Sequence, residues 1–531
     1  MIDSQLHDRE LYLGLDLGTS GLKAVAVAPC GDLVAFTSTG YQTSRPVPGA
    51  AEQDPGCWTA AVRDALAGLA KDAPPVSWRA IGLTGMLPTL VTADASGKPV
   101  GPAITWEDSR AETQAHLLRT RFGRNGERDG GEALYRITGQ WVDGRYLLPM
   151  FARIAADEPD RAAGTATILG AKDFLFGWLT GHLATDPSTA TGFGCYDLSS
   201  SNWAGEVLTA AADTMAAVLP SLPPVWPSGS TRPLREDLAA EFGCGKIPVC
   251  LGAADSVVGA DALGACSAGQ VAYVAGTSTV VLGITDRLVL DPWNRFLVTP
   301  LVSDGMWGME MDLLATGSSL RWLAGLLGGG LDEAGVLALA AQLDPADAPV
   351  FLPYLSPGEQ GALWDPGLTG SVTGLTLRHD RRHLARALVN GIVLESRRCV
   401  HVLDEIGPLR GELLVAGGSA AAASFRADLA DATGRPVVAP PGQDAAFSAF
   451  GAARLAAGGS WPASGEALSV TEPDLRKTAV WDALWDAHER ARLSEVRLGL
   501  PRGVAELEQL GDRLEVPRRP GRWRLVLPLR K

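Results

Sequence analysis

The tripeptide Gly-Thr-Ser occurs twice in this chain, at Gly18-Thr19-Ser20 and at Gly276-Thr277-Ser278, each time between two short apolar runs. Apolar, β-branched runs on either side of a glycine-containing turn are typical of a hairpin. A segment that recurs in both halves of a chain indicates an internal duplication. The flanking runs, which we predict to be strands, are residues 11–17 and 23–27 around the first turn and 271–274 and 279–284 around the second.

Turns of this kind can direct backbone N–H groups and hydroxyls at a phosphate. The first copy also has an acid, Asp16, just before the turn, where it can hold Mg²⁺ directly or through water. This segment has neither the GxxxxGK[ST] spacing of a Walker A loop nor a dinucleotide-binding GxGxxG. One such turn alone would be an ordinary tight turn, whereas two copies beside placed aspartates favour phosphate binding.

A lone carboxylate, Asp255, follows a short apolar run over residues 247–251 and precedes a stretch of small residues with helical spacing. An α/β sheet presents its chemistry where strands end, and the N-terminus of the following helix favours a negative charge. Asp255 is therefore our candidate general base.

Length and composition limit the classes of protein to consider. A chain of 531 residues is too long to fold around a single hydrophobic core, so we expect two domains of a few hundred residues. The net charge of −14 argues against a nucleic-acid partner. No apolar run is long enough for a membrane span and the N-terminus is too polar for a signal peptide, so we expect a cytoplasmic protein. Its seven cysteines are scattered along the chain, and we expect them to be buried free thiols.

Two further strands end in loops that can meet at one cleft. Residues 80–83 lead into Met86-Leu87-Pro88, and residues 103–106 lead into a loop that contains Asp108. If both strands follow the usual rule for open α/β sheets, both loops face the same side. Earlier in the chain, Asp54 followed by Pro55 predicts the start of a helix.

Taken in order, these motifs resemble the FGGY carbohydrate kinases, the xylulokinase and glycerol kinase group built on the actin-like ATPase fold. The resemblance covers about residue 11 to about residue 455. The segments that carry it are Asp16-Leu17-Gly18-Thr19-Ser20, Glu52-Gln53-Asp54-Pro55, Trp106-Glu107-Asp108-Ser109-Arg110, Gly252-Ala253-Ala254-Asp255, Gly276-Thr277-Ser278, Leu352-Pro353-Tyr354-Leu355 and Ala416-Gly417-Gly418-Ser419.

The resemblance implies an α/β fold of two actin-like (ribonuclease H-like) lobes with an interdomain cleft, each lobe with a mixed five-stranded sheet. The first domain would span residues 1–250, with the sugar-binding loops and the first phosphate turn. The second would span 251–495, with the catalytic aspartate, the second phosphate turn and an adenosine loop. Residues 496–531, rich in basic side chains, would form a C-terminal extension.

In the family, the loop at Met86 and Leu87 and the loop at Asp108 hold the sugar. This chain departs from the Gln-Met-His or Arg-Glu usual at the first loop, so its substrate can differ there. Asp108 would accept hydrogen bonds from sugar hydroxyls; a salt bridge to Arg110 or a helix cap is the equal alternative. Met150 stands where a lysine is usual and the tryptophan beyond it is missing, with Arg153 nearby; we expect this region to pack a helix.

The family places Gly317 beside the nucleotide. Glycines at Gly417 and Gly418, followed by Ser419, would let the backbone approach the adenine and α-phosphate, although tight packing alone would also explain them. Lys23 would help to neutralise the phosphates of ATP, and Asp16 would hold Mg²⁺.

These expectations describe an ATP-dependent sugar or polyol kinase, with a ketopentose such as xylulose as substrate and Asp255 as acceptor of the hydroxyl proton. The alternatives are a catalytically weak sugar-binding or regulatory protein on the same fold and an actin- or chaperone-like ATPase with a protein partner. A homodimer is possible, as in similar proteins.

Overall fold

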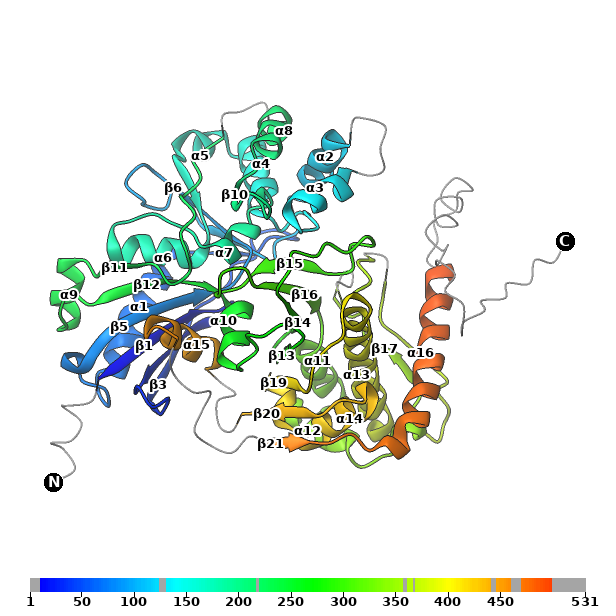
Figure 1. Cartoon of the computed structure of the whole chain (residues 1–531). Helices are drawn as coiled ribbons and strands as arrows, with labels where there is room; N and C mark the ends of the chain where they lie inside the picture. Colours follow the sequence, from blue (N-terminus) through cyan, green and yellow to red (C-terminus); the bar gives the residue numbers. More distant parts are fainter. Residues whose placement is uncertain are drawn as a thin grey trace, which may run out of the picture.

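The computed structural model describes residues 10–123, 130–215, 219–356, 361–365, 368–440, 446–459 and 469–498. The chain forms two α/β lobes, each built around a mixed sheet with helices against it (Figure 1). This arrangement confirms the predicted fold class. The remaining residues, which include Gln443-Asp444-Ala445 and the basic extension after residue 498, lie outside the described part.

In the described chain, the sheet of the first lobe has six strands in the order β11-β12-β5-β1-β2-β3. Strands β12, β5 and β1 run parallel, and β11, β2 and β3 pair antiparallel with their neighbours. The strands are β1 (Leu11–Leu17), β2 (Gly21–Val27), β3 (Leu33–Gly40), β5 (Trp78–Gly85), β11 (Thr231–Pro233) and β12 (Pro248–Ala254).

The sheet of the second lobe has seven strands among the residues described, in the order β15-β16-β14-β13-β19-β20-β21. The expectation of five strands per sheet was therefore wrong for both lobes, because short edge strands extend each one. The strands are β13 (Val271–Ala275), β14 (Thr279–Thr285), β15 (Leu297–Pro300), β16 (Trp307–Leu313), β19 (Leu413–Gly417), β20 (Val437–Ala439) and β21 (Ser469–Thr471).

The two sheets repeat the same local topology, which supports the predicted duplication. Strand β1 pairs antiparallel with β2 and parallel with β5, and β13 pairs antiparallel with β14 and parallel with β19. Both Gly-Thr-Ser segments therefore lie at the carboxyl end of a parallel strand, next to the end of a second parallel strand.

A second expectation about the strands was also wrong. Strand β7 (Ala103–Thr105) is not in the main sheet: it pairs antiparallel within a small sheet of order β4-β7-β6-β8. Its partners are β4 (Glu52–Gln53), β6 (Thr89–Ala93) and β8 (Thr167–Leu169), and two further two-stranded pairs are β9 (Tyr196–Asp197) with β10 (Asn202–Trp203) and β17 (Val350–Leu352) with β18 (Ser371–Thr373).

The described helices cover the sheets. Those before β12 are α1 (Pro55–Leu69), α2 (Glu112–Phe122), α3 (Gly130–Thr138), α4 (Leu147–Asp157), α5 (Pro159–Gly164), α6 (Ala171–Thr180), α7 (Pro187–Thr191), α8 (Gly205–Met215) and α9 (Glu236–Phe242). Those after it are α10 (Asp255–Ala262), α11 (Gly317–Leu327), α12 (Glu333–Ala340), α13 (Arg381–Ile406), α14 (Ala423–Thr433), α15 (Phe447–Ala456) and α16 (Thr478–Leu498). Asp54 caps α1 through its side chain, as the Asp-Pro pair predicts.

Helix α15 comes from the end of the chain but lies against the first sheet (Figure 1). It approaches so closely that a Cβ on Gly14 would lie 1.7 Å from the Ala449 carbonyl oxygen, and one on Gly82 would lie 1.9 Å from that of Ala452. Apolar residues of α10 and α15 form one core with residues of β13, β14 and β19. These two helices therefore join the lobes, and the first sheet extends to Ala254, past the expected boundary at residue 250.

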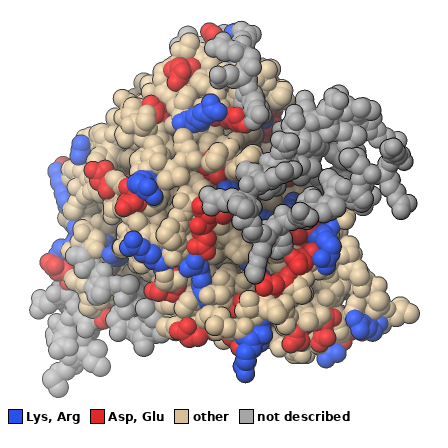
Figure 2. All heavy atoms as spheres, turned by 45° about the vertical axis from the view of Figure 1, so that its right-hand side comes forward, with Lys and Arg blue, Asp and Glu red and all other residues tan. Residues whose placement is uncertain are grey.

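The exposed surface also revises a smaller expectation. All seven cysteines are free, but Cys30, Cys57 and Cys266 are exposed and not buried. Within the described residues, no helix is long and apolar enough to cross a membrane. Figure 2 shows basic and acidic side chains scattered among one another over the visible face.

Candidate active site

Asp16 and Asp255 lie at the same edge of the first sheet, although 239 positions separate them in the sequence. The register places Asp16 opposite Thr84 on β5, and Thr84 opposite Ala253 on β12. Since neighbouring strands are about 4.8 Å apart, the backbones of β1 and β12 at this edge are separated by roughly 10 Å. Asp16 is the next-to-last residue of β1 and Asp255 directly follows β12, so both acids lie at the carboxyl ends of parallel strands, where the sequence predicted the cleft.

Asp255 is the first residue of α10 and is partly exposed. Its Oδ1 accepts a hydrogen bond from the Ser256 N–H at 2.8 Å. Burial raises the pKa of Asp255 to about 7, and the negative charges of Asp16 and Glu310 add to the effect. A carboxylate with a pKa near neutrality can take up a proton during a reaction at physiological pH.

Asp16 is 8% exposed, and its Oδ1 has no hydrogen-bond partner among the described residues. Burial raises its pKa to about 6, against the opposing charge of Lys23, which lies opposite it on β2. An unpartnered buried carboxylate oxygen fits a cation ligand. The described residues hold no cluster of three or more metal-binding side chains, so a cation here would also need water or phosphate oxygens.

The first Gly-Thr-Ser turn is held by side chains from three other segments. Tyr41 donates its hydroxyl to the Gly18 carbonyl, and Gln53 Nε2 donates to the Thr19 carbonyl at 2.7 Å. The Trp106 indole N–H donates to Thr19 Oγ1 at 2.9 Å. The loop after β7 therefore reaches this turn even though β7 belongs to a different sheet.

The second turn is held by backbone at close range. A Cβ on Gly317 would lie 2.3 Å from the Gly276 carbonyl oxygen, and the Ser318 N–H donates to the Thr277 carbonyl at 3.0 Å. The Gly418 N–H donates to the Ala275 carbonyl at 3.0 Å, and a Cβ on Gly417 would lie 1.9 Å from the same oxygen. Three segments predicted to bind the nucleotide therefore meet here, with Ser419 directly after the last.

Glu310 on β16 lies beside Asp255 and was not identified from the sequence. Its carboxylate accepts a hydrogen bond from Thr299 Oγ1 at 2.8 Å, and burial raises its pKa. The available signal was the alternation of acids with apolar residues in Met309-Glu310-Met311-Asp312-Leu313. That signal does not say which group of the other lobe the acid faces.

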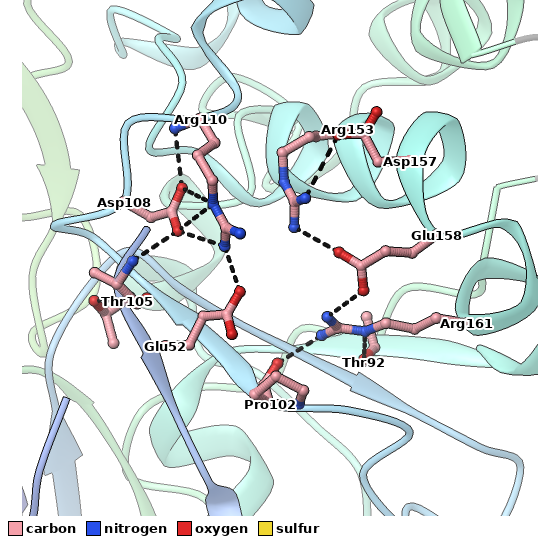
Figure 3. Close-up of polar contacts among 11 residues, drawn as sticks. Glu52, Thr92, Pro102, Thr105, Asp108, Arg110, Arg153, Asp157, Glu158 and Arg161 are labelled. Atoms are coloured by element: carbon pink, nitrogen blue, oxygen red, sulfur yellow. Dashed lines mark hydrogen bonds and ion pairs between the residues drawn. The ribbon is translucent and has the colours of Figure 1, made fainter. Parts of the chain in front are cut away.

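The two predicted sugar loops differ in exposure. Met86 is buried and packs in the core of the first lobe, whereas Leu87 is partly exposed and packs beside Ala254 and Val257, next to Asp255. Asp108 is buried and forms a bidentate ion pair with Arg110, which also contacts Glu52 (Figure 3). The structure therefore has the salt bridge that was the alternative for Asp108.

Arg153 of α4 is also fixed by acids. Its guanidinium pairs with Glu158 at 3.0 Å and with Asp157 at 3.6 Å, and Glu158 in turn binds Arg161 (Figure 3). The Arg153 side chain is 6% exposed. This segment therefore has the packing role that we expected of it.

Comparisons with known proteins agree with this geometry. The profile described as "FGGY family of carbohydrate kinases, N-terminal domain" matches residues 11–262, and the profile of the family's C-terminal domain matches residues 271–459. The chain is 30% identical over 447 residues to xylulose kinase of Escherichia coli K12, covering 84% of this chain and 89% of that protein. It is 28% identical over 445 residues to gluconokinase of Bacillus licheniformis, covering 81% and 84%.

A solved structure gives the same result in three dimensions. The crystal structure of xylulose kinase from Rhodospirillum rubrum matches with a TM-score of 0.80 and 30% identity, covering 92% of this chain and all of that one. Sequence profiles and fold agree over nearly the whole described molecule. The chain belongs to the FGGY family of carbohydrate kinases.

Proposed function

We propose that this protein transfers the γ-phosphoryl group of ATP to a hydroxyl of a neutral ketose, with a ketopentose such as xylulose as substrate. The observation that carries the proposal is Asp255: a partly exposed carboxylate with a pKa raised to about 7, at the same sheet edge as Asp16. Phosphoryl transfer needs mainly positioning and charge stabilisation, and a carboxylate suffices as base because the hydroxyl proton leaves late.

Asp255 would accept the proton of the attacking hydroxyl. The hydrogen bond from the Ser256 N–H orients Oδ1, and the N-terminus of α10 favours the charged form. Burial and the charge of Asp16 act in the other direction and raise the pKa to about 7, which suits a general base at physiological pH.

The two turns would hold the phosphates of ATP from either side. Gly18-Thr19-Ser20 and Gly276-Thr277-Ser278 are exposed or partly exposed and lie at the ends of β1 and β13. Gly317, Gly417, Gly418 and Ser419 would lie along the nucleoside, and Lys23 would offset phosphate charge. Asp16 would hold Mg²⁺, which when bound would neutralise part of the charge on the phosphate oxygens.

A neutral acceptor fits the charges better than a sugar acid. The carboxylates of Asp16 and Glu310 both raise the pKa of Asp255, so the base already has negative neighbours. Arg145, which has Asp312 of β16 as a charged neighbour, donates to Asp143 through Nε and Nη2. A carboxylated substrate would add a further negative charge near these groups and would be repelled.

The test is ATP consumption by the purified protein with D-xylulose, other ketoses, polyols, glycerol and gluconate. We expect a neutral ketose to give the highest kcat/KM. Asp255→Asn should lower kcat with that sugar about 100- to 10,000-fold, because it removes the base. Asp64→Asn, on the exposed face of α1, is the matched control and should behave as wild type.

Three results would contradict the proposal. Sugar-independent ATP hydrolysis would favour an ATPase with a protein partner. Sugar binding without phosphorylated product would favour a regulatory protein on this fold. A preference for gluconate would leave the kinase activity and overturn the neutral substrate.

A further inference from the structure

The peptide group between Ala253 and Ala254, immediately before Asp255, is held at both ends by buried hydroxyls. Thr84 Oγ1 donates to the Ala253 carbonyl at 2.8 Å, and the Ala254 N–H donates to Ser188 Oγ at 2.9 Å. Both hydroxyl-bearing residues are at most 1% exposed. The base is thus attached to a peptide group whose orientation side chains determine.

The strand ladder is interrupted just before this peptide group, and Ala253 and Ala254 then pair again with Thr84 and Gly85 on β5. The pairing of β12 with β5 shifts between Cys250 and Ala253, and Gly252 has a φ of +76°. A Cβ on Gly252 would lie 1.6 Å from the Leu83 carbonyl oxygen, so no other residue fits there. Past this bulge, Thr84 and Ser188 supply contacts that fix where the strand ends.

Ser188 is held in turn by a buried ion triad. Its hydroxyl donates to Asp186 Oδ2 at 2.5 Å, and Lys172 Nζ lies 2.8 Å from Asp186 Oδ1 and 2.7 Å from Asp173 Oδ1. The three ionised side chains are at most 2% exposed. A charged carboxylate only accepts hydrogen bonds, so the Ser188 proton is committed to Asp186 and its oxygen must accept from Ala254.

The surroundings of Asp186 favour its charged form. Burial opposes ionisation of Asp186, but Lys172 and the hydrogen bonds from Ser188 and Thr189 outweigh it and lower its pKa. Replacing a buried ion cluster by apolar side chains is often neutral or stabilising, so stability alone does not explain this one. Asp186 also caps α7 and accepts a hydrogen bond from Ser228, and through Ser188 the triad reaches the peptide group before Asp255.

We propose that Lys172, Asp186 and Ser188 form a positioning chain that fixes the Ala253–Ala254 peptide group and thereby aims the Asp255 carboxylate at the attacking hydroxyl. The proposal rests on the proposed function, since it assigns Asp255 as the base. The three residues touch neither substrate nor nucleotide: they act through Asp255.

The variant that tests the chain is Ser188→Ala, which removes the acceptor for the Ala254 N–H. We expect kcat to fall about 10- to 100-fold, because a displacement of the base by about 1 Å costs that much, with KM for ATP and for the sugar changed less than threefold. Ser188→Thr keeps the hydroxyl and should restore kcat to within about threefold of wild type.

Ser228→Ala is the matched control. Ser228 Oγ donates to the same oxygen, Asp186 Oδ2, at 3.0 Å, whereas the side chains that hydrogen-bond the Ala253–Ala254 peptide group are those of Thr84 and Ser188. It should lose a buried hydrogen bond as Ser188→Ala does and keep kcat within about threefold of wild type. Thermal unfolding of both variants identifies any loss of fold.

Equal kcat values for Ser188→Ala and Ser228→Ala, with folded proteins, would overturn the positioning chain and leave the kinase assignment intact. A second measurement uses Asp255→Asn as background: if Ser188 acts through the base, Ser188→Ala should lower the residual activity no further. If Ser188→Ala lowered the activity of the Asp255→Asn protein by as large a factor as it lowers that of wild type, the positioning chain would be overturned. A folded wild type inactive with every sugar would overturn the proposed function and this inference together.

Discussion

The two Gly-Thr-Ser turns share a tripeptide and a place in the topology, yet they are built differently. The first follows Asp16 and is closed from the Gly18 N–H to the Gly21 carbonyl at 3.1 Å, with Tyr41, Gln53 and Trp106 donating to it. The second is closed from the Gly276 N–H to the Ser278 carbonyl at 2.8 Å and is one residue shorter. Its neighbours are the backbones of Gly317 and Gly418, and Val274 takes the place of Asp16.

Under the proposed function, this difference means that the two turns would bind different parts of the nucleotide. The first turn has the charged side chain of Asp16 and is held in place by side-chain donors, so it suits a cation and the reacting phosphate. Glycine backbones offer close approach and N–H donors, so the second turn suits the remainder of the nucleotide. A duplicated hairpin has thus kept its backbone while its chemistry has diverged.

Among changes at the two turns, the largest effect should come from Asp16→Asn. Asparagine keeps the shape but loses the charge for a cation, so we expect kcat to fall about 100- to 1,000-fold, as for loss of one strong electrostatic contact to the transition state. The equivalent change at the other turn, Val274→Ala, should leave kcat within a few-fold. Steady-state kinetics across a magnesium titration measure both. Equal losses would show that the two turns do the same work.

Gly317→Ala should damage the second turn specifically. The added Cβ would lie 2.3 Å from the Gly276 carbonyl oxygen, so the turn must move, and we expect KM for ATP to rise about 10-fold or more. Gly325→Ala lies in the same helix with nothing within 4 Å of the new Cβ. That control should keep its KM and gain about 0.5–1 kcal/mol of stability. An unchanged KM in Gly317→Ala would remove this segment from the nucleotide site.

The pH dependence of unfolding separates the charged turn from the uncharged one. The pKa of Asp16 is raised from 3.8 to about 6, so the folded state favours the protonated acid and its stability falls as pH rises from about 4 to about 6. Asp16→Asn should therefore match wild type near pH 4 and exceed it above pH 6, by on the order of 1–3 kcal/mol. Urea unfolding at pH 4.5, 6 and 7.5 measures this pH-dependent gain in stability over wild type. Val274→Ala should show no such gain at any of the three pH values. A difference independent of pH would mean that Asp16 is paired in solution.

The sequence predicted what local chemistry decides. Both hairpins, the Asp54 cap and the strand-to-helix junction at Asp255 follow from turn residues, capping and apolar runs, and the structure has each of them. Long-range pairing was less accessible. The edge strand β11 is three residues long and includes Pro233, so no periodicity marks it. Strand β7 was predicted as a strand, but its antiparallel partners β4 and β6 were not, because sequence pattern does not show which segments pair.

The site shows the same division. Asp16 and Asp255 could be found because each ends an apolar run, whereas Glu310 could not, because its proximity to Asp255 depends on how β16 lies against α10. Asp108 had two equal interpretations, since a side chain two residues from an arginine can serve either a ligand or that arginine. Only coordinates show that Arg110 binds it.

The smallest effect should come from the bracing of the first turn. Trp106→Phe keeps the ring but removes the N–H that donates to Thr19 Oγ1, and one hydrogen bond is worth about 1 kcal/mol. We expect KM for ATP to rise about three- to fivefold with kcat nearly unchanged. Trp203→Phe removes a similar indole bond, to the Pro223 carbonyl at 3.1 Å, away from either turn, and should not change KM. If both variants raised KM equally, the effect would be a general loss of packing, and the first turn would not depend on side chains for its shape.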